Sequence, residues 1–588
     1  MRLARLIRLP VVVLLVLTGC TTSQHPKTGR ADEPFQALAD EFVQGYLAWR
    51  PAIGTALGLH EYDGRITDMS QGSVTAELAR LKTFDRRLDG LETNALSRRG
   101  WYDFQILRTA IRREIFAFEG RHAYTQQPMT YAGALNVNIY IKRDFAPLAQ
   151  RVRSVISILQ EAPAVFAAAR ANLEAELARP FIETAIEVAQ GSATFLGQDL
   201  AAALKDFREE PLRSQFEAAN QRAIAELQSY ATWLRDQRLP RAHDRFAIGR
   251  QKYIRMLREG ELVELSPEQV LEMGLRELRR EQEVFAATAR LIDSTKKPIE
   301  VFKDIQKDHP TEDSLLPDTR KNLEAIRQFL LDREIVGVPS DVRARVEETP
   351  QFDRATSFAS MDTPGPFETR ATEAYYYVTP VEKDWSPQQK EEWLTAFNYY
   401  TTDVVSIHEA YPGHYLQFLC LNASPASRLE KIFSSYAFVE GWAHYTEQMM
   451  LDMGFGPNMP SRLLQSDALK TAKYRLAQSD EALLRLCRLC VSVQMHCQGM
   501  SVDQATKFFQ ENCYYEEKPA RQEASRGTYD PEYLYYTLGK LQILELRRDY
   551  QKQEGTAFTL KRFHDEMLRH GMPPIQLLRD VLLKPKRA

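Results

Sequence analysis

The sequence predicts a large, mostly α fold with one small β element. The chain has 588 residues, of which 44% are hydrophobic and 26% are charged, a composition typical of globular proteins with a substantial core. Apolar residues recur at a spacing of three to four with charged residues between them, which is the pattern of amphipathic helices. Strand patterns are scarce by comparison. The helical pattern is clearest in residues 76–91, 152–177 and 216–237.

Two short stretches predict where further helices begin. In SPEQ, Ser266 to Gln269, the serine suits a helix cap, the proline fits the first turn and the glutamine can close a capping box. The stretch SPQQ, Ser386 to Gln389, repeats this arrangement. We therefore expect helices to begin directly after Ser266 and Ser386.

The strongest strand candidate is TEAYYYVTP, Thr372 to Pro380, whose centre is Tyr375, Tyr376 and Tyr377. Aromatic and β-branched residues dominate it, and a proline-rich loop precedes it. No repeat, low-complexity segment or linker divides the chain cleanly. We expect two closely packed parts, an N-terminal helical half of residues 36–360 and a C-terminal half of residues 361–588 that carries the chemistry.

The first residues predict a targeting segment that is not part of the fold. Three arginines precede a short apolar run, Leu9 to Leu17, which is too short to span a bilayer comfortably. The run leads into LTGC, which resembles the bacterial lipobox with Cys20 as the lipidated residue. We expect residues 1–19 to be a lipoprotein signal peptide and residues 20–35 a lipidated tether; a plain signal peptide and an uncleaved anchor are the alternatives. Because residue 21 is not aspartate, we expect a lipid anchor in the bacterial cell envelope at the outer membrane.

Charge and cysteine content exclude some classes of protein. The net charge is −3, without the basic excess of a nucleic-acid-binding protein. Five cysteines follow Cys20, an odd number that cannot pair completely. Cys487 and Cys490 have the spacing of a metal or redox motif, but they lie in an apolar stretch that predicts a buried helix, where cysteine packs as a small hydrophobe. We favour that buried structural role.

The segment HEAYPGHYLQ, His408 to Gln417, contains the residue types of a zinc site. Histidines four apart on a helix differ in direction by about 40° and can share a metal, whereas residues six apart differ by about 240°. His408 and His414 are six apart, so a continuous helix cannot use both. Pro412 lacks an N–H and Gly413 reaches unusual backbone angles, so we expect a bulge or loop that returns His414 to the metal. The alternative is a surface histidine and a core histidine beside an ordinary helix break.

Glu440 is the expected third ligand of a single Zn²⁺ ion. It begins Glu-Gly-Trp-Ala, which looks like the Glu-Gly-Phe-Ala segment of the aminopeptidase N family, and gluzincin peptidases take a glutamate ligand from the next helix. His444 lies one helical turn later and competes for this place, but we favour Glu440 and expect His444 to support a ligand or lie at the surface. Glu447, a further turn along, could orient a ligand imidazole through its ring N–H.

Glu409 has the position of a general base beside a ligand. There it can accept a proton from the zinc-activated water and pass it to the leaving amine. The oxyanion that develops needs a further donor. His496 is one candidate, with an ordinary core histidine as the alternative. Further candidates, each with packing as an equal alternative, are Tyr536 first and then Tyr529, Tyr535 and Arg526.

These residues resemble a bacterial family, number 885 in the domain-of-unknown-function series, which is related to the gluzincin metallopeptidases. The resemblance rests mainly on His408 to Gln417 and Glu440 to Ala443. It implies a large helical peptidase-like fold with a deep channel, broadly like thimet oligopeptidase and angiotensin-converting enzyme. In such folds a strand beside the zinc helix holds the substrate backbone, and a tyrosine and sometimes a histidine stabilise the oxyanion. Weaker matches are Gly58–Gly64, residues 266–278, the segment after His496 and Tyr536–Lys540.

The resemblance assigns the substrate strand to Tyr375–Tyr377 and the oxyanion donors to Tyr536 and His496. Two departures bear on these assignments. The family usually has an apolar residue at His444, which argues against a ligand there, and an acidic residue at Ser492, whose loss weakens the role of His496.

The sequence therefore predicts a zinc-dependent metallopeptidase that hydrolyses short or unfolded peptides outside the cytoplasm. Its expected partners are peptide substrates and the membrane that holds its lipid anchor; no nucleic-acid partner is expected. The alternatives are a metal-dependent amidase that acts on cell-wall peptides and a non-catalytic peptide-binding lipoprotein. The cleaved end of the substrate and the oligomeric state stay open.

Overall fold

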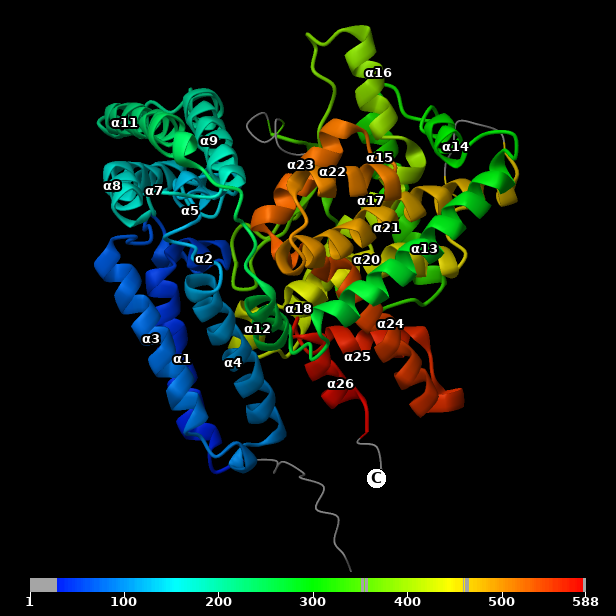
Figure 1. The fold of residues 1–588 in the computed structure, drawn as a ribbon, viewed down its shortest axis with the longest axis horizontal. Helices are drawn as coiled ribbons and strands as arrows, with labels where there is room; N and C mark the ends of the chain where they lie inside the picture. The colour runs from blue at the N-terminus through cyan, green and yellow to red at the C-terminus, as the bar shows by residue number, and fades with distance from the viewer. Residues whose placement is uncertain (1–28, 351–353, 355–357, 458, 460–464, 585–588) are drawn as a thin grey trace, which may run out of the picture.

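Helices build most of the chain that the structure describes, as Figure 1 shows. The structure is a computed structural model that describes residues 29–350, 354, 358–457, 459 and 465–584. Helices account for 69% of the described residues and strands for 3%, which confirms the predicted mostly α class with a small sheet. The predicted signal peptide and the lipidation site at Cys20 lie outside the described residues.

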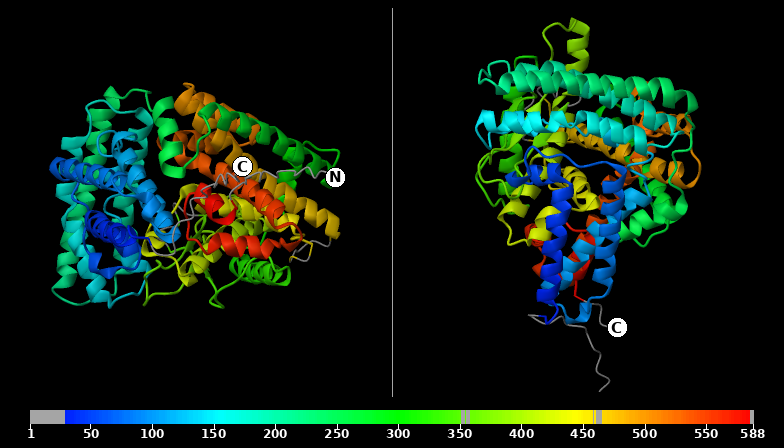
Figure 2. Two further views of the ribbon diagram at one scale, coloured as in Figure 1. Left: turned by 90° about the horizontal axis from the view of Figure 1, so that it is seen from below. Right: turned by 90° about the vertical axis from the view of Figure 1, so that its left-hand side faces the viewer.

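The N-terminal helices form a separate group on one side of the molecule (Figure 1, left; Figure 2, left). Two apolar cores hold them, one mainly within α1, α3 and α4 and the other mainly within α5–α9 and α11. Phe433 of the C-terminal part packs edge-on against Tyr46 and so joins the first core to the rest of the chain. The bounds are α1 Asp32–Trp49, α2 Pro51–Ala56, α3 Gln71–Asp89, α4 Arg98–Glu119, α5 Met129–Ala132, α6 Ile139–Lys142, α7 Leu148–Gln160, α8 Ala162–Asn172, α9 Arg179–Thr194, α10 Ala201–Ala203 and α11 Leu212–Trp233.

One stretch among the described residues, Leu148–Asn172, is long and apolar enough to cross a membrane. Half of its most apolar window is buried inside the fold, where α7 and α8 contribute to the second core. This burial is typical of core helices in globular proteins.

The remaining helices surround one large core. The bounds are α12 Arg250–Glu261, α13 Pro267–Ile292, α14 Pro298–Ile305, α15 Leu315–Asp332, α16 Pro387–Ala396, α17 Tyr399–Glu409, α18 His414–Ala423, α19 Arg428–Ile432, α20 Tyr436–Asp452, α21 Asp467–Cys497, α22 Val502–Asn512, α23 Glu517–Tyr529, α24 Tyr535–Glu554, α25 Leu560–Leu568 and α26 Ile575–Leu582. Because α12–α15 pack in this core, the cores divide near residue 245, whereas the predicted halves meet at residue 360.

The small sheet has the strand order β1-β3-β2, with β1 at Arg345–Glu348, β2 at Ala359–Asp362 and β3 at Tyr375–Val378. β3 is the central strand, since it pairs in parallel with β1 and antiparallel with β2. Beside β1, the Arg320 side chain of α15 donates hydrogen bonds of 3.0 and 2.8 Å to the Val346 carbonyl. Among the described residues, no strand pairs with the outer edge of β2.

Several local predictions are confirmed. α13 and α16 begin after Ser266 and Ser386, and both serines form complete capping boxes with the predicted glutamines. Cys487 and Cys490 are buried in α21, and the five described cysteines are all free.

A buried carboxyl group on α17 gives a testable consequence for stability. Asp403 accepts hydrogen bonds from Tyr474 of α21 and Asn322 of α15. Burial raises the pKa of Asp403 from 3.8 to about 7, although both hydrogen bonds act in the opposite direction. The folded protein thus keeps a proton that the unfolded chain releases, so this group's contribution to stability is lost as the pH rises from about 4 to about 7.

The Asp403→Asn variant should lack this pH dependence, because an amide does not titrate and can keep both hydrogen bonds. The free energy of unfolding of the wild type should fall relative to the variant by up to about 1.4 kcal/mol per pH unit in that window. Denaturant unfolding between pH 4 and 8 measures this difference. Asp313→Asn, at an exposed position, serves as the control. If the free energy of unfolding depends on pH in the same way in the wild type and in Asp403→Asn, the raised pKa of Asp403 is contradicted.

Candidate metal centre

A break in the helix between His408 and His414 determines the geometry of the candidate site. α17 ends at Glu409 and α18 begins at His414, with a cis peptide bond between Tyr411 and Pro412. The Gly413 N–H donates to the Ile407 carbonyl at 3.0 Å, so the chain folds back on the last turn of α17. The predicted interruption at Pro412 is therefore present.

Gly413 is required because the turn is very tight. A Cβ atom at this position would lie 1.7 Å from the His408 carbonyl oxygen, far inside van der Waals contact. A second contact fixes the turn from outside, since the buried Trp442 indole of α20 donates to the Pro412 carbonyl at 2.9 Å. The turn is thereby held against the helix that carries Glu440.

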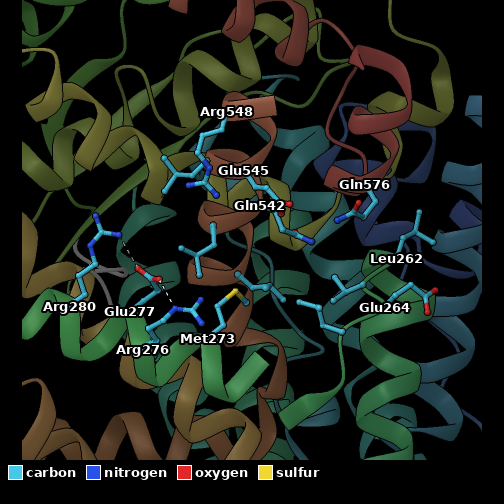
Figure 3. Close-up of a pocket in the computed structure, with 15 residues that line it drawn as sticks. Leu262, Glu264, Met273, Arg276, Glu277, Arg280, Gln542, Glu545, Arg548 and Gln576 are labelled. Atoms are coloured by element: carbon cyan, nitrogen blue, oxygen red, sulfur yellow. Dashed lines mark ion pairs between the residues drawn. The ribbon is translucent and has the colours of Figure 1, made fainter. Parts of the chain in front are cut away.

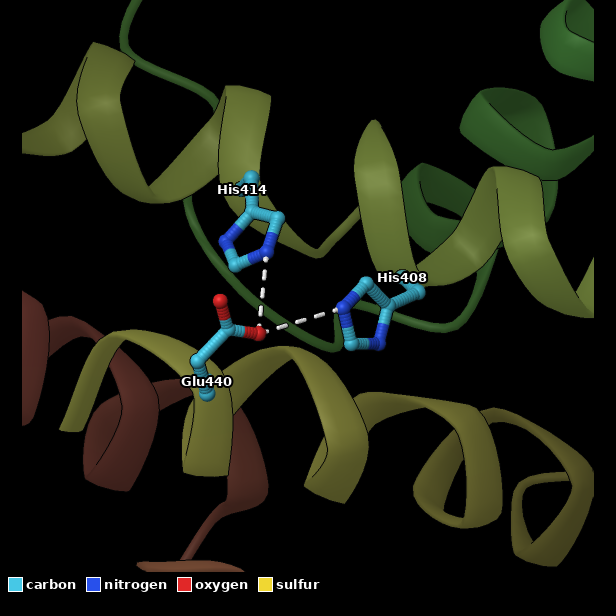
Figure 4. A group of neighbouring side chains, drawn as sticks. All are labelled: His408, His414 and Glu440. Carbon is cyan, nitrogen blue, oxygen red and sulfur yellow. Dashed lines mark ion pairs between the residues drawn. The ribbon is translucent and has the colours of Figure 1, made fainter. Parts of the chain in front are cut away.

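His408, His414 and Glu440 converge as a result (Figure 4). The Nε2 atoms of both imidazoles lie 3.5 Å from Glu440 Oε2, and one potential ligand atom from each residue lies within 4.8 Å of the other two. Ligand atoms at about 2.0–2.2 Å from a tetrahedral zinc ion are themselves roughly 3.4 Å apart. The observed spacing thus matches the spacing that a shared metal ion requires.

The polar atoms of this cluster also fit a cation. Glu440 Oε2 is buried without a hydrogen-bond partner, and 3.5 Å is too long for a good hydrogen bond to it. Buried polar atoms are normally satisfied, because each unsatisfied one costs about 1–3 kcal/mol. Two imidazoles and one carboxylate are the donor set of a catalytic zinc site, which leaves a fourth position for water.

Glu447 orients the first imidazole. Its Oε1 accepts a hydrogen bond of 2.7 Å from His408 Nδ1, which leaves the Nε2 lone pair directed toward Glu440. Its Oε2 accepts one of 3.0 Å from His444 Nδ1. The predicted contact of Glu447 with the ring N–H of a ligand imidazole is therefore present. His444 donates to Glu447 and is not one of the three clustered residues.

Two carboxylates near His408 raise its pKa. Burial alone would lower the pKa of His408, but the neighbouring carboxylates of Glu440 and Glu447 raise it to about 9. Burial opposes the negative charge of Glu440, yet the two imidazoles hold its pKa well below the ordinary range. Burial lowers the pKa of His444 to about 3, so this imidazole is neutral at physiological pH.

Two glycines bring a tyrosine to the cluster. A Cβ on Gly441 of α20 would lie 2.6 Å from the backbone of Gly539 in α24, and one on Gly539 would lie 1.9 Å from the Ala437 carbonyl. This close helix contact places Tyr536, near the start of α24, with its ring stacked 6.4 Å from that of His408. Burial and the charge of Glu440 raise the pKa of Tyr536, so its hydroxyl keeps its proton.

Glu409 lies near the sheet, since its charge acts on a tyrosine of β3. It is the last residue of α17 and is partly exposed, whereas His408 is buried. Its negative charge contributes to the raised pKa of Tyr376 in β3, whose hydroxyl hydrogen-bonds with Ser406 at 3.1 Å. The predicted strand thus lies beside the helix that carries His408 and Glu409.

Comparison with known proteins identifies the family. A family model described as "Bacterial protein of unknown function (DUF885)" matches residues 51–582. The chain belongs to the DUF885 family. The comparison with curated proteins gives no match.

Two solved structures share the fold of this DUF885 chain. One is a candidate lipoprotein of unknown function from Shewanella oneidensis, with 24% identity, a TM-score of 0.76, and coverage of 94% of this chain and 100% of that chain. The other is a candidate lipoprotein from Colwellia psychrerythraea, with 17% identity, a TM-score of 0.74, and coverage of 94% and 98%. At these identities the likeness establishes the fold.

Contacts elsewhere in this DUF885 structure bear on the roles predicted for His496 and for Tyr375–Tyr377. The buried His496 donates from Nε2 to the Gly527 carbonyl at 2.8 Å and accepts at Nδ1 from the Ile248 N–H at 3.3 Å, so both ring nitrogens are used by the backbone. It is an ordinary core histidine, with its pKa lowered to about 4 by burial. The strand Tyr375–Tyr377 cannot hold a substrate backbone, because β1 and β2 occupy both of its edges.

The remaining tyrosine and arginine candidates lie farther from the cluster. Arg526 pairs with Asp530 and donates at 3.3 Å to the Tyr436 hydroxyl. Tyr436 packs edge-on against Tyr536, and the charge of Arg526 also acts on Tyr536. Tyr535 is buried, with its hydroxyl directed to the Met256 carbonyl.

Tyr529 ends α23, and the charges that act on it are those of Arg526, Asp530, Glu523 and Glu187. No contact of Tyr529 with the cluster is found in the described part of the chain.

Sequence reasoning missed two buried arginines of α21. Arg485 pairs with Glu447 at 3.5 Å and with Glu481, and Arg488 forms a bidentate pair with Glu523. Their guanidinium carbons lie 5.7 and 5.4 Å from the ring centroid of Tyr536. Two arginines one turn apart in the mostly apolar stretch of residues 482–493 were the available signal, because buried cations need partners.

A separate cavity of about 370 Å³ lies between α13 and α24 (Figure 3). Glu277 pairs there with Arg276 and Arg280 at 3.5 and 3.6 Å. None of the three clustered residues lines this cavity, so it does not belong to the candidate metal centre.

The Gly413→Ala variant tests the role of the turn. The added methyl group cannot fit beside the His408 carbonyl, so His414 should move and zinc affinity should fall about tenfold or more. Competition with a chromogenic chelator measures the affinity. Gly191→Ala in α9 is the matched control, since a Cβ there meets nothing within 4 Å. Equal zinc affinity in wild type and Gly413→Ala would contradict the role of the turn.

The Glu447→Gln variant tests the orientation of His408. The amide is a weaker acceptor for the Nδ1 proton, so zinc affinity should fall by about 10- to 100-fold. Because Glu447 also pairs with Arg485, Glu481→Gln is the control that disturbs the same arginine without touching His408. An equal loss in both variants would assign the effect to Arg485.

Proposed function

We propose that this DUF885 protein is a zinc-dependent metallopeptidase that hydrolyses short or unfolded peptides. One observation carries the proposal: the buried, unpartnered Glu440 Oε2 lies 3.5 Å from two imidazole Nε2 atoms, one of which Glu447 orients. In a purely structural cluster, a hydrogen-bond donor to Glu440 Oε2 would make the fold more stable. The arrangement is instead suited to a divalent cation.

The proposed mechanism assigns the chemistry to three groups. A zinc ion held by His408, His414 and Glu440 would polarise the scissile carbonyl and activate water at neutral pH. Glu409 accepts the proton of the attacking water and gives it to the nitrogen of the leaving amine. Tyr536, whose hydroxyl keeps its proton, donates a hydrogen bond to the developing oxyanion.

The outer edge of β2 is the candidate for holding an extended substrate backbone. Peptides commonly add as a strand to an unpaired sheet edge. β3 has both edges paired, and Arg320 of α15 donates to a β1 carbonyl, whereas no described strand pairs with the outer edge of β2. We therefore transfer the proposed substrate-strand role from Tyr375–Tyr377 to Ala359–Asp362.

We also propose that Cys20 carries a lipid that anchors the protein in the cell envelope, at the outer membrane. The sequence LTGC and the short apolar run before it support this proposal. The two structures that share the fold are candidate lipoproteins, which is consistent with it.

The Glu409→Gln variant tests the mechanism. The amide keeps the size of the side chain but cannot accept the proton, so kcat should fall by about 10²- to 10⁴-fold while zinc content stays the same. Cleavage of a peptide library followed by mass spectrometry measures activity and identifies the cleaved end. The exposed Glu392→Gln in α16 is the control.

Three outcomes would decide against the proposal. A wild-type protein that contains no zinc, or activity that survives in Glu409→Gln, would contradict the mechanism. A protein that cleaves only cell-wall peptides would favour the amidase alternative.

A further inference from the structure

The hydroxyl group of Tyr536 has a clear task in the proposed mechanism but no partner that fixes its direction. It makes no hydrogen bond with a described residue, whereas the hydroxyl of its neighbour Tyr535 donates to the Met256 carbonyl at 3.4 Å. An unbonded hydroxyl suits a donor to a substrate oxyanion. Its direction must then come from the contacts of the ring that carries it.

Four side chains surround the ring of Tyr536 in the described part of the chain. The His408 imidazole is stacked on it with 6.4 Å between the ring centroids, and Tyr436 packs edge-on at 5.8 Å. The guanidinium carbons of Arg485 and Arg488 lie 5.7 and 5.4 Å from its centroid, which is within the range of cation–π contacts. These contacts determine where the hydroxyl points.

The two arginines lie one turn apart on α21 but pair with different carboxylates. Arg485 pairs at 3.5 Å with Glu447, which accepts a hydrogen bond from the predicted metal ligand His408. Arg488 instead donates two hydrogen bonds, of 2.8 and 2.7 Å, to Glu523 of α23. A change at Arg488 therefore alters the surroundings of the tyrosine ring without altering the pairing of Glu447.

The pair of Arg488 and Glu523 can hold the ring firmly. Arg488 is 8% exposed, and a bidentate pair fixes the plane of a guanidinium group as well as its place. Burial opposes the charge of Glu523, yet the pairing with Arg488 holds its pKa below the ordinary value. The positive charges of Arg488, Arg526 and Arg485 act against the raised pKa of Tyr536, that of Arg488 most strongly. Such a charge also makes the hydroxyl a better donor.

We propose that Arg488, held by Glu523, is a positioning residue that directs the Tyr536 hydroxyl toward the developing oxyanion. This inference rests on the proposed peptidase function and adds a residue to its mechanism. Arg488 acts through Tyr536 and does not touch the substrate. Because an oxyanion donor acts in the transition state, a misdirected hydroxyl lowers kcat and leaves substrate binding nearly unchanged.

The Arg488→Lys variant tests this role. A lysine keeps the positive charge, but it cannot form the bidentate pair or present a planar group to the ring. For a peptide identified by library cleavage, kcat should fall about tenfold, while KM and zinc content stay within about twofold of the wild type. Steady-state kinetics and metal analysis measure these quantities.

A double-mutant cycle with Tyr536→Phe separates positioning from a purely structural effect. Tyr536→Phe alone should lower kcat by about 10²-fold, because the oxyanion donor is lost. With the hydroxyl absent, adding Arg488→Lys should change kcat by less than about twofold. Equal losses in both backgrounds would overturn the inference. A raised KM with unchanged kcat in Arg488→Lys would also overturn it, since Arg488 would then bind the substrate.

Glu523→Gln is the second variant and decides the matter if Arg488→Lys does not fold. It removes the charged partner of Arg488 and keeps the size of the side chain, so kcat should fall about three- to fivefold, and only when Tyr536 is present. An unchanged kcat would overturn the inference.

Arg475→Lys is the matched control. Arg475 lies on the same helix, α21, and donates to Gln478 at 2.9 Å. Its replacement should leave kcat within about twofold of the wild type. A tenfold loss there would assign the effect to α21 as a whole and overturn the inference.

A failure of the proposed function is distinguishable from a failure of this inference. If the wild type cleaves no peptide, crystal structures of the wild type and Arg488→Lys still test the positioning. A Tyr536 ring that leaves the His408 imidazole in the variant would support the role of Arg488, whereas an unmoved ring would reject it.

Discussion

The close approach of the Gly413 backbone to the His408 carbonyl is the constraint on which the rest of the site depends. It lets two histidines six residues apart present Nε2 atoms to one carboxylate. Trp442 holds the turn against α20, and the glycine contact between α20 and α24 sets Tyr536 beside the same cluster. Close backbone contacts at three small residues therefore assemble groups from α17, α18, α20 and α24.

The cluster is held in a buried network of charges. Glu447 contacts His408, His444 and Arg485, and every one of these residues is at most 8% exposed. Such groups are costly to bury unless each has a partner, and the same low exposure fixes their positions firmly. This rigidity suits a site whose donor atoms must lie within a few tenths of an ångström of the correct geometry.

Local sequence patterns predicted the features that depend on neighbouring residues. The capping boxes at Ser266 and Ser386, the helix break at Pro412 and the strand at residues 375–378 all follow from short stretches. Features that depend on distant segments were not predictable in this way. His496 is satisfied by Gly527 and Ile248, and the central position of β3 is set by strands that precede it. Likewise, Arg485 pairs with Glu447 of α20 and Arg488 pairs with Glu523 of α23, and both partners are distant in the sequence.

Anomalous diffraction at the zinc absorption edge, from crystals of the purified protein grown with zinc, tests the central claim most directly. We expect one strong peak at about 2.0–2.2 Å from His408 Nε2, His414 Nε2 and a carboxylate oxygen of Glu440, with Glu447 still bonded to His408 Nδ1. A peak elsewhere, coordination by His444 in place of Glu440, or no peak at the cluster would contradict it.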